Sequence, residues 1–541
     1  MAIPDDSAAD AGMRRSWRVT HLPTPSWRPM ALTRLLALLL LWLVRCATAS
    51  PWPTTDWPVS TPEAQGVDSK ALIALYEVIA QPALHADSVL IVRNGHVVSE
   101  AHFAPYEAGL VHDLRSVTKS VLGTLIGIAL EQGRIRALEQ PVMSFFPEHR
   151  AIDPRQRTMT VEHLLDMRAG IEWREWPYDE QSDVLRMAGS ADWLRYILNQ
   201  PMHDQPGTDF HYSGAAAHLL SAILTRASGQ SAAAFAGQSL FAPLGIGDTK
   251  WLKDPQGNAI GESGLSLKPR DLAKIGLLYL RDGVWDGRRL LPAWWVPRVF
   301  GASKVHKVDQ RRGLPPRYSL LWWVDARVPM AVASGRHGQH LVILPKHDTI
   351  LVLTAKTPDL DVEPLHISRL VTSGLLPALH AAGPLAPNPG AQGRLRELLM
   401  SVTAANPLRG VSAPDLALRV AGRTYRFEDN RLGLASLSLQ FSGDHQARLT
   451  THWRTRTAPG REGRLELPFG DDGRYVKSEA TPYGVFASRG AWQDEATMLF
   501  QTEALTNSIS TLMRLHFVAD RLELTVSDGD GLRISLQGQA R

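Results

Sequence analysis

The chain has 541 residues, of which 44% are hydrophobic and 21% are charged, and its formal net charge at pH 7 is +4. This length exceeds the ~250–300 residues at which a single hydrophobic core stops growing, so two or more domains are expected. The small net charge, with no long block of lysine and arginine, excludes a dedicated nucleic-acid binder. The single cysteine, Cys46, excludes an internal disulfide and thiolate metal sites.

Residues 1–49 end in the pattern of a secretion signal. An arginine precedes an apolar run over residues 35–44, which is too short to span a bilayer. The small residues Ala47-Thr48-Ala49 then mark a cleavage site. We therefore expect an N-terminal extension and signal peptide, cleavage before Ser50, and a secreted or periplasmic protein. Two alternatives, both of which would hold the protein at a membrane, stay open: lipid attachment at Cys46 and an uncleaved anchor.

The next segments predict a hairpin followed by helices. Two β-runs, 88–92 and 96–102, flank the turn signal Asn94-Gly95. An apolar helix is expected after Ser116, ending at Gly133, and the chain then has mostly helical patterns as far as Gly245. One of these later helices is predicted over residues 215–227.

The second half of the chain is richer in β-patterns. Strands are expected at 318–326 and 331–333, then a hairpin with strands at 341–344 and 350–354, and a closing helix over 365–380. The Pro/Gly-rich residues 383–394 are typical of a linker. Short alternating runs follow, which predict an all-β barrel. The predicted domains are a hydrolase-type domain at 50–382, the linker at 383–394, and an all-β, lipocalin-like domain at 395–541.

Ser116 and Lys119 are three residues apart at the start of the apolar helix, so they share one helical face. A serine hydroxyl needs a neighbouring base to become a good nucleophile. A lysine serves as that base if its pKa falls, and burial beside an apolar helix is expected to lower it. The alternative is that Ser116 is an ordinary helix N-cap.

Two further motifs follow in order, Tyr212-Ser213-Gly214 and Arg336-His337-Gly338. The ordered set resembles the penicillin-recognising serine hydrolases, whose signatures are Ser-x-x-Lys, Tyr-x-Asn and Lys/His-x-Gly. This family includes class C β-lactamases, DD-peptidases, family VIII esterases and 6-aminohexanoate-oligomer hydrolases. The resemblance covers about residues 58–380, and His337-Gly338-Gln339 ahead of a strand most resembles the aminohexanoate-oligomer branch.

The resemblance implies an α+β fold, in which an antiparallel sheet is flanked by helices and joined to a mostly helical subdomain. It also implies roles for individual residues. Ser116 would attack an acyl carbon, Lys119 would take or share its proton, and Tyr212 would relay that proton to the leaving group. The backbone N–H groups of Ser116 and Gln339 would hold the oxyanion, and Gly338 would let substrate lie against the strand.

Two positions depart from the family pattern. Gly214 replaces the asparagine of Tyr-x-Asn, which weakens a β-lactamase assignment. Arg336 replaces the frequent lysine, and it is predicted either to hold a substrate carboxylate or to be an ordinary solvated residue. His337 is assigned to the substrate site, although simple packing is an equally ordinary role.

The predicted function is a serine hydrolase that cleaves a small amide or ester through an acyl-enzyme, with no cofactor and no metal. Two alternatives stay open. One is a β-lactamase or D-Ala-D-Ala-type peptidase. The other is a catalytically silent binding protein of the same fold.

Overall fold

The computed structural model describes residues 52–177, 180–301, 313–357, 366–380, 383–454, 462–506, 510–528 and 531–541. The predicted signal segment, with Cys46, lies outside these residues. Within them, the helices are too short or too polar for any one to cross a lipid bilayer.

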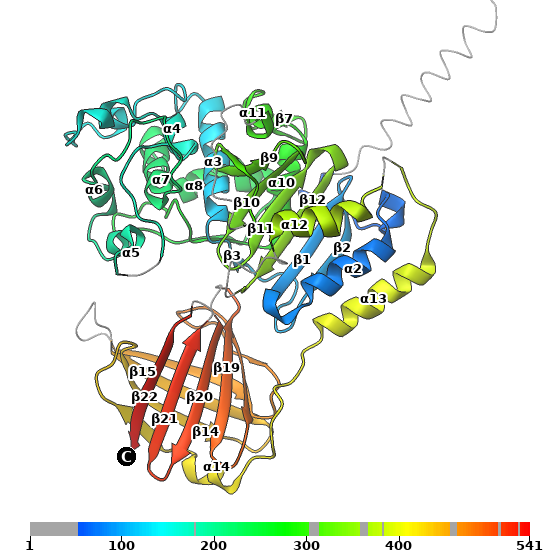
Figure 1. Cartoon of the computed structure of the whole chain (residues 1–541), viewed down its shortest axis with the longest axis vertical. Helices are drawn as coiled ribbons and strands as arrows, with labels where there is room; N and C mark the ends of the chain where they lie inside the picture. Colours follow the sequence, from blue (N-terminus) through cyan, green and yellow to red (C-terminus); the bar gives the residue numbers. More distant parts are fainter. Residues whose placement is uncertain are drawn as a thin grey trace, which may run out of the picture. The chain divides into compact units, whose positions relative to one another are not determined.

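A seven-stranded antiparallel sheet forms the centre of the first domain, in the order β2-β1-β12-β11-β10-β9-β8 (Figure 1). The first predicted hairpin is confirmed, since its two strands flank a turn at Asn94 and Gly95 with positive φ values. The sheet is built from β1 (Ala86–Arg93), β2 (His96–His102), β8 (Arg317–Ser319), β9 (Trp322–Asp325), β10 (Met330–Gly335), β11 (Gln339–Leu344) and β12 (Thr349–Ala355).

Helices surround this sheet and form a second lobe beside it (Figure 1). Helix α10 packs on β1, β11 and β12, while α2 packs with α13. These helices are α2 (Ser69–Ile79), α3 (Val117–Glu131), α4 (Val161–Leu165), α5 (Asp183–Ala188), α6 (Trp193–Leu198), α7 (Gly214–Ser228), α8 (Ala232–Ala236), α9 (Ala242–Leu244), α10 (Pro269–Leu280), α11 (Trp295–Gly301), α12 (Ile367–Arg369) and α13 (Pro389–Thr403). A further helix, α14 (Asp415–Val420), lies in the C-terminal region.

Helix α3 is the most buried helix around the sheet, with every residue from Val117 to Ala129 shielded from solvent. Its all-round apolar sequence is typical of a helix that is enclosed on every side. Two glycines allow the close approach. A Cβ at Gly123 would come within 2.8 Å of the Leu320 carbonyl oxygen, and one at Gly127 would meet the Trp295 ring at 2.9 Å. The position of the side chains on the first turn of α3 is therefore fixed by the packing of the whole helix.

The C-terminal region is a β-barrel, as predicted. Its strands pair antiparallel in the order β16-β15-β14-β13-β22-β21-β20-β19-β18-β17, and a parallel contact between β16 and β18 at Gly470 and Arg489 closes the ring. The strands are β13 (Thr424–Phe427), β14 (Leu434–Phe441), β15 (Gln446–Arg454), β16 (Glu462–Gly470), β17 (Val476–Lys477), β18 (Phe486–Trp492), β19 (Thr497–Ala504), β20 (Ser510–Val518), β21 (Arg521–Asp528) and β22 (Arg533–Ala540). The fold class is confirmed.

Three details of the sequence prediction were wrong. The strand predicted over 318–326 is two strands, because Leu320 and Leu321 both have positive φ values and break the pairing. The closing helix is interrupted after Arg369 by a π-helical turn (Leu370–Leu375). Helix α13 begins at Pro389, inside the predicted linker 383–394, because Asn388 caps it. The outer domain limits, 50–382 and 395–541, stay predictions.

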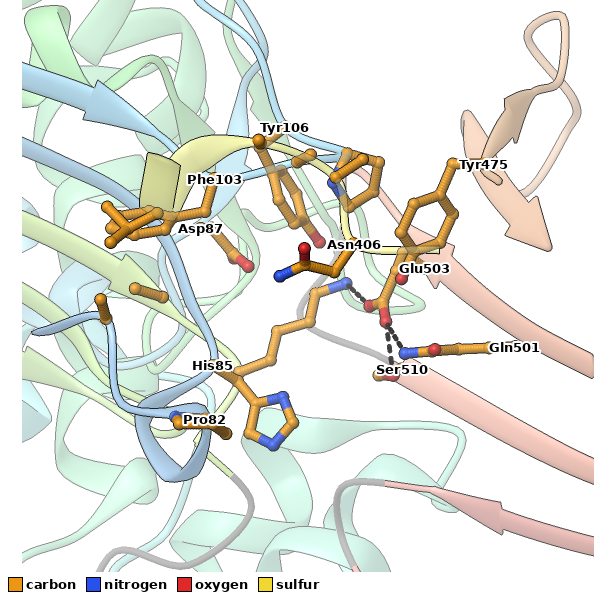
Figure 2. A pocket seen from close by; sticks show the side chains of 18 of the residues that line it. Pro82, His85, Asp87, Phe103, Tyr106, Asn406, Tyr475, Gln501, Glu503 and Ser510 are labelled. Carbon is orange, nitrogen blue, oxygen red and sulfur yellow. Dashed lines mark hydrogen bonds and ion pairs between the residues drawn. The ribbon is translucent and has the colours of Figure 1, made fainter. Parts of the chain in front are cut away.

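A cavity of about 390 Å³ lies where strands of the barrel meet the first domain (Figure 2). At its edge the ammonium of Lys356 donates to Glu503 Oε2 at 2.9 Å, and both side chains are less than a tenth exposed. The other carboxylate oxygen of Glu503 accepts hydrogen bonds from Gln501 and Ser510 (Figure 2). The two parts of the chain are thus joined by a buried ion pair.

Replacing Lys356 by methionine is expected to lower the free energy of unfolding by about 3–5 kcal/mol, because the Glu503 carboxylate would stay buried without its cation. Thermal and urea denaturation measure this change. The matched control is Lys346→Met, which removes an exposed lysine after β11. Adding Glu503→Leu to Lys356→Met should restore most of the loss. If Lys356→Met and Lys346→Met had equal melting temperatures, the prediction would be contradicted.

Candidate functional site

Ser116 lies at a sharp turn where a short strand gives way to helix α3. Strand β3 (His112–Asp113) pairs with β5 (Leu265–Leu267), and Arg115 then adopts a positive φ of 48°. A non-glycine residue in this conformation is uncommon and is often found at functional sites. Ser116 occupies the N-cap position of α3, but its side chain makes no capping hydrogen bond. The N-cap alternative therefore does not account for its hydroxyl.

Lys119 lies one helical turn further on and points back at the serine. Its Nζ donates to Ser116 Oγ at 3.0 Å and to the backbone oxygen of Glu262 at 2.9 Å. The lysine is only 2% exposed, so its ammonium has little access to water. The predicted contact between the hydroxyl and the amine is present.

Tyr212 comes from a different element, the residue before the N-cap of α7, where Ser213 accepts a hydrogen bond from the Ala216 backbone N–H. The Lys119 Nζ lies 4.9 Å from the centroid of the Tyr212 ring. That ring stacks with Trp176 at 5.2 Å and with Trp323 at 5.7 Å between centroids. The stacks fix the ring plane beside the serine and the lysine.

The third motif forms the turn between β10 and β11. A Cβ at Gly335 would come within 2.5 Å of the Leu114 carbonyl oxygen, so the turn approaches the segment just before Ser116. Gly338 has a φ of 87°, and a Cβ there would meet Ala355 at 2.9 Å. The positive φ and the close approach of Ala355 each explain why residue 338 is a glycine, without any contact with substrate.

Side chains of this turn mostly hold the turn itself. His337 is buried and its Nδ1 lies 3.1 Å from the Thr357 carbonyl oxygen. The Gln339 side-chain amide donates to the Ala355 carbonyl oxygen. The part of Gln339 that the predicted oxyanion site would use is its backbone N–H. Arg336 is half-buried, and its predicted contact with a substrate carboxylate stays a prediction.

Two buried carboxyl groups that no sequence motif indicated lie beside this cluster. A Cβ on Gly214 would come 2.1 Å from Glu262 Oε2 and 3.3 Å from Glu175 Oε2. Glu175 Oε2 also accepts hydrogen bonds from the Gly214 N–H at 2.8 Å and the Trp173 indole at 2.7 Å. Glu262 therefore fills the space that a side chain at position 214 would need. Two features of the sequence could have indicated this contact: the glycine at position 214, and the acidic residue Glu262 in a loop of otherwise apolar and small residues.

The charge on Lys119 differs from the prediction. Burial lowers its pKa, as expected, but its neighbours outweigh that effect. The Tyr212 side chain, followed by Glu175 and Glu262, favours the ammonium and holds the pKa of Lys119 above its ordinary value. Burial raises the pKa of Glu262 to about 7, against the opposing effect of Lys119 and with help from Glu175.

One group of the described residues has metal-ligand geometry. The ligand atoms of His203, Asp204 and His211 lie within 4.8 Å of one another, and Asp204 pairs with both histidines at 2.9 Å. The two histidines are exposed, and the group precedes Tyr212 in the chain.

The arrangement around Ser116 itself consists of a hydroxyl, an amine, a phenol and backbone N–H groups, a set that suits acyl transfer.

Comparisons with known proteins agree with this description. The family described as Beta-lactamase matches residues 75–373. The chain is 29% identical over 296 residues to the 6-aminohexanoate-dimer hydrolase of Paenarthrobacter ureafaciens, covering 52% of this chain and 75% of that protein. It is 26% identical over 213 residues to esterase EstB of Burkholderia gladioli, covering 35% and 53%.

Among solved structures, one from Bacillus anthracis is assigned by its name to the 6-aminohexanoate-dimer hydrolases. It matches with a TM-score of 0.51 and 20% identity, covering 62% of this chain and 89% of that chain. This likeness supports the fold of the first domain.

Proposed function

The chain belongs to the beta-lactamase family, and from that premise we propose that it is a secreted serine hydrolase that cleaves a small amide or ester through an acyl-enzyme on Ser116. The observation that carries the proposal is the 3.0 Å hydrogen bond from Lys119 Nζ to Ser116 Oγ at the start of a buried helix, with Tyr212 beside it. The relatives named for amide and ester hydrolysis support the same reaction class.

In the first half of the reaction, the Ser116 oxygen bonds to the acyl carbon while its proton passes to the Lys119–Tyr212 pair. The pair then donates a proton to the departing nitrogen or oxygen, and the bond to the leaving group breaks. Because the pKa of Lys119 is held above its ordinary value, the pair must first lose a proton before it can accept one. A water molecule later attacks the acyl carbon with the same pair as base, the bond from that carbon to the Ser116 oxygen breaks, and the pair returns a proton to that oxygen.

The negative charge that develops on the substrate oxygen needs two converging donors. The proposed donors are the backbone N–H groups of Ser116 and Gln339. The first lies at the N-cap of α3, the end of the helix at which its dipole favours a negative charge. The second is the first residue of β11, at the turn that approaches Leu114.

The substrate proposal depends on Gly214 and Glu262. A bicyclic β-lactam has a side-chain amide and a carboxylate that must be held together, and residue 214 offers no side chain for the amide. Glu262 occupies that space instead. A missing hydrogen-bond partner costs about 1–3 kcal/mol. A linear amide or ester, with its carboxyl end near Arg336, is the better fit.

We expect measurable hydrolysis of p-nitrophenyl butyrate and a kcat/KM for nitrocefin that is lower by at least ~10²-fold, on the scale of ~1.4 kcal/mol per tenfold. Both substrates are assayed side by side on one preparation of the full protein. A higher kcat/KM for nitrocefin would favour the β-lactamase alternative. No turnover and no labelling by a fluorophosphonate probe would favour a silent binding protein.

A further inference from the structure

We propose that Glu262 is a positioning residue that controls the charge of the Lys119–Tyr212 pair and thereby the pH range in which Ser116 reacts. This inference rests on the proposed function and adds a residue to that site. It concerns a carboxyl group that takes the place of a side chain at position 214.

The position of Glu262 is fixed by its backbone as well as by packing. Its carbonyl oxygen accepts a hydrogen bond from the Lys119 ammonium at 2.9 Å, and three residues beyond it the chain enters β5, which pairs with β3. The Leu265 N–H also donates to Thr118 Oγ1 at 3.3 Å, which ties this segment to the first turn of α3. The Glu262 side chain, 8% exposed, then lies against the Cα of Gly214.

The titratable groups that act on Glu262 are Lys119 on α3 and Glu175 on the segment before α5. Beyond them lie Tyr212 just before α7, His218 on α7 with its partner Asp254, and Tyr318 on β8, whose ring centroid is 6.2 Å from that of Tyr212. Burial raises the pKa of Tyr318 well above its usual value, so this group stays neutral. The charges that act on Glu262 are those of Lys119 and Glu175.

Because the pKa of Glu262 is about 7, its carboxyl group changes charge in the neutral range. Below that pH it is neutral, and above that pH it adds a negative charge beside the catalytic pair. The reactive form of the pair has one proton fewer, and therefore one positive charge fewer, than the resting form. A nearby anion disfavours that loss, whether the proton leaves Lys119 or Tyr212. The ionised Glu262 thus limits how strongly the reaction rate rises with pH.

The test is the rate at which a fluorophosphonate probe labels Ser116, measured across pH for the parent and for Glu262→Gln. The ratio of variant to parent rates is expected to be near one below about pH 6 and to rise to about tenfold above about pH 8, since one nearby charge shifts a pKa by about one unit or more. The matched control is Glu172→Gln, which removes an exposed carboxylate from the same segment as Glu175.

The outcomes separate this inference from the proposed function. A parent protein that is not labelled at Ser116 at any pH would contradict the proposed function. A labelled parent with a rate ratio that stays constant across pH would contradict the role of Glu262 alone, because a purely structural loss is independent of pH. If Glu262→Gln does not fold, Glu175→Gln should move the inflection of the parent profile from near pH 7 to lower pH, since Glu175 raises the pKa of Glu262. An unmoved inflection would contradict the inference.

Discussion

Ser116→Ala is expected to lower turnover of p-nitrophenyl butyrate by at least ~10⁴-fold while leaving the melting temperature unchanged, since removal of a nucleophile has effects of this order or larger. The hydroxyl makes no capping hydrogen bond, and it accepts a hydrogen bond from the Lys119 ammonium. Its loss therefore removes the attacking atom without removing a contact that holds α3. Steady-state kinetics and differential scanning calorimetry measure the two quantities.

Intact-mass spectrometry of fluorophosphonate-treated protein gives the direct control, because the adduct should appear on the parent and be absent from the alanine variant. Ser144→Ala, at an exposed serine of the short helix Val142–Phe145, should retain both labelling and turnover. Substantial activity in the Ser116 variant would place the nucleophile elsewhere in the chain.

Tyr212→Phe is expected to lower kcat by ~10²-fold or more, the scale for removing a positioned acid or base. Phenylalanine preserves the stacking with Trp176 and Trp323, so the aromatic cluster should keep its geometry. Only the hydroxyl beside the Lys119 ammonium is lost. The measurement is kcat for the same ester, with thermal denaturation as a check on folding.

Tyr483→Phe serves as the matched control, because this tyrosine of the C-terminal domain is 58% exposed. Its variant should have parental kinetics. If Tyr212→Phe also had parental kinetics, Tyr212 would have no part in proton transfer, and Lys119 would have to act alone.

Local patterns were sufficient to predict most of the fold. The hairpin around Asn94-Gly95 and the helix after Ser116 each depend on residues adjacent in sequence, and both are present. The barrel was indicated by alternating runs separated by turn residues, as in β14. Interruptions such as the left-handed turn at Leu320 depend on packing against α3, which no local pattern records.

The site shows the same division between local and distant effects. The spacing of Ser116 and Lys119 predicted their contact because one helical turn separates them. The direction of the Lys119 pKa was wrong, since it depends on Glu175 and Glu262, which approach from segments that lie far from α3 in sequence. The ion pair of Lys356 with Glu503 spans an even longer separation and had no sequence signal. The roles of Arg336 and Gln339 stay predictions.

The contact between residues 214 and 262 also limits the mutational routes open to this chain. With a Cβ at position 214 only 2.1 Å from Glu262 Oε2, the asparagine of the family motif cannot be introduced while that carboxyl group keeps its place. The two positions are therefore expected to be coupled: either the Glu262 side chain moves away or a shorter residue at 262 accompanies the change at 214. A laboratory library that pairs the two positions samples both routes together.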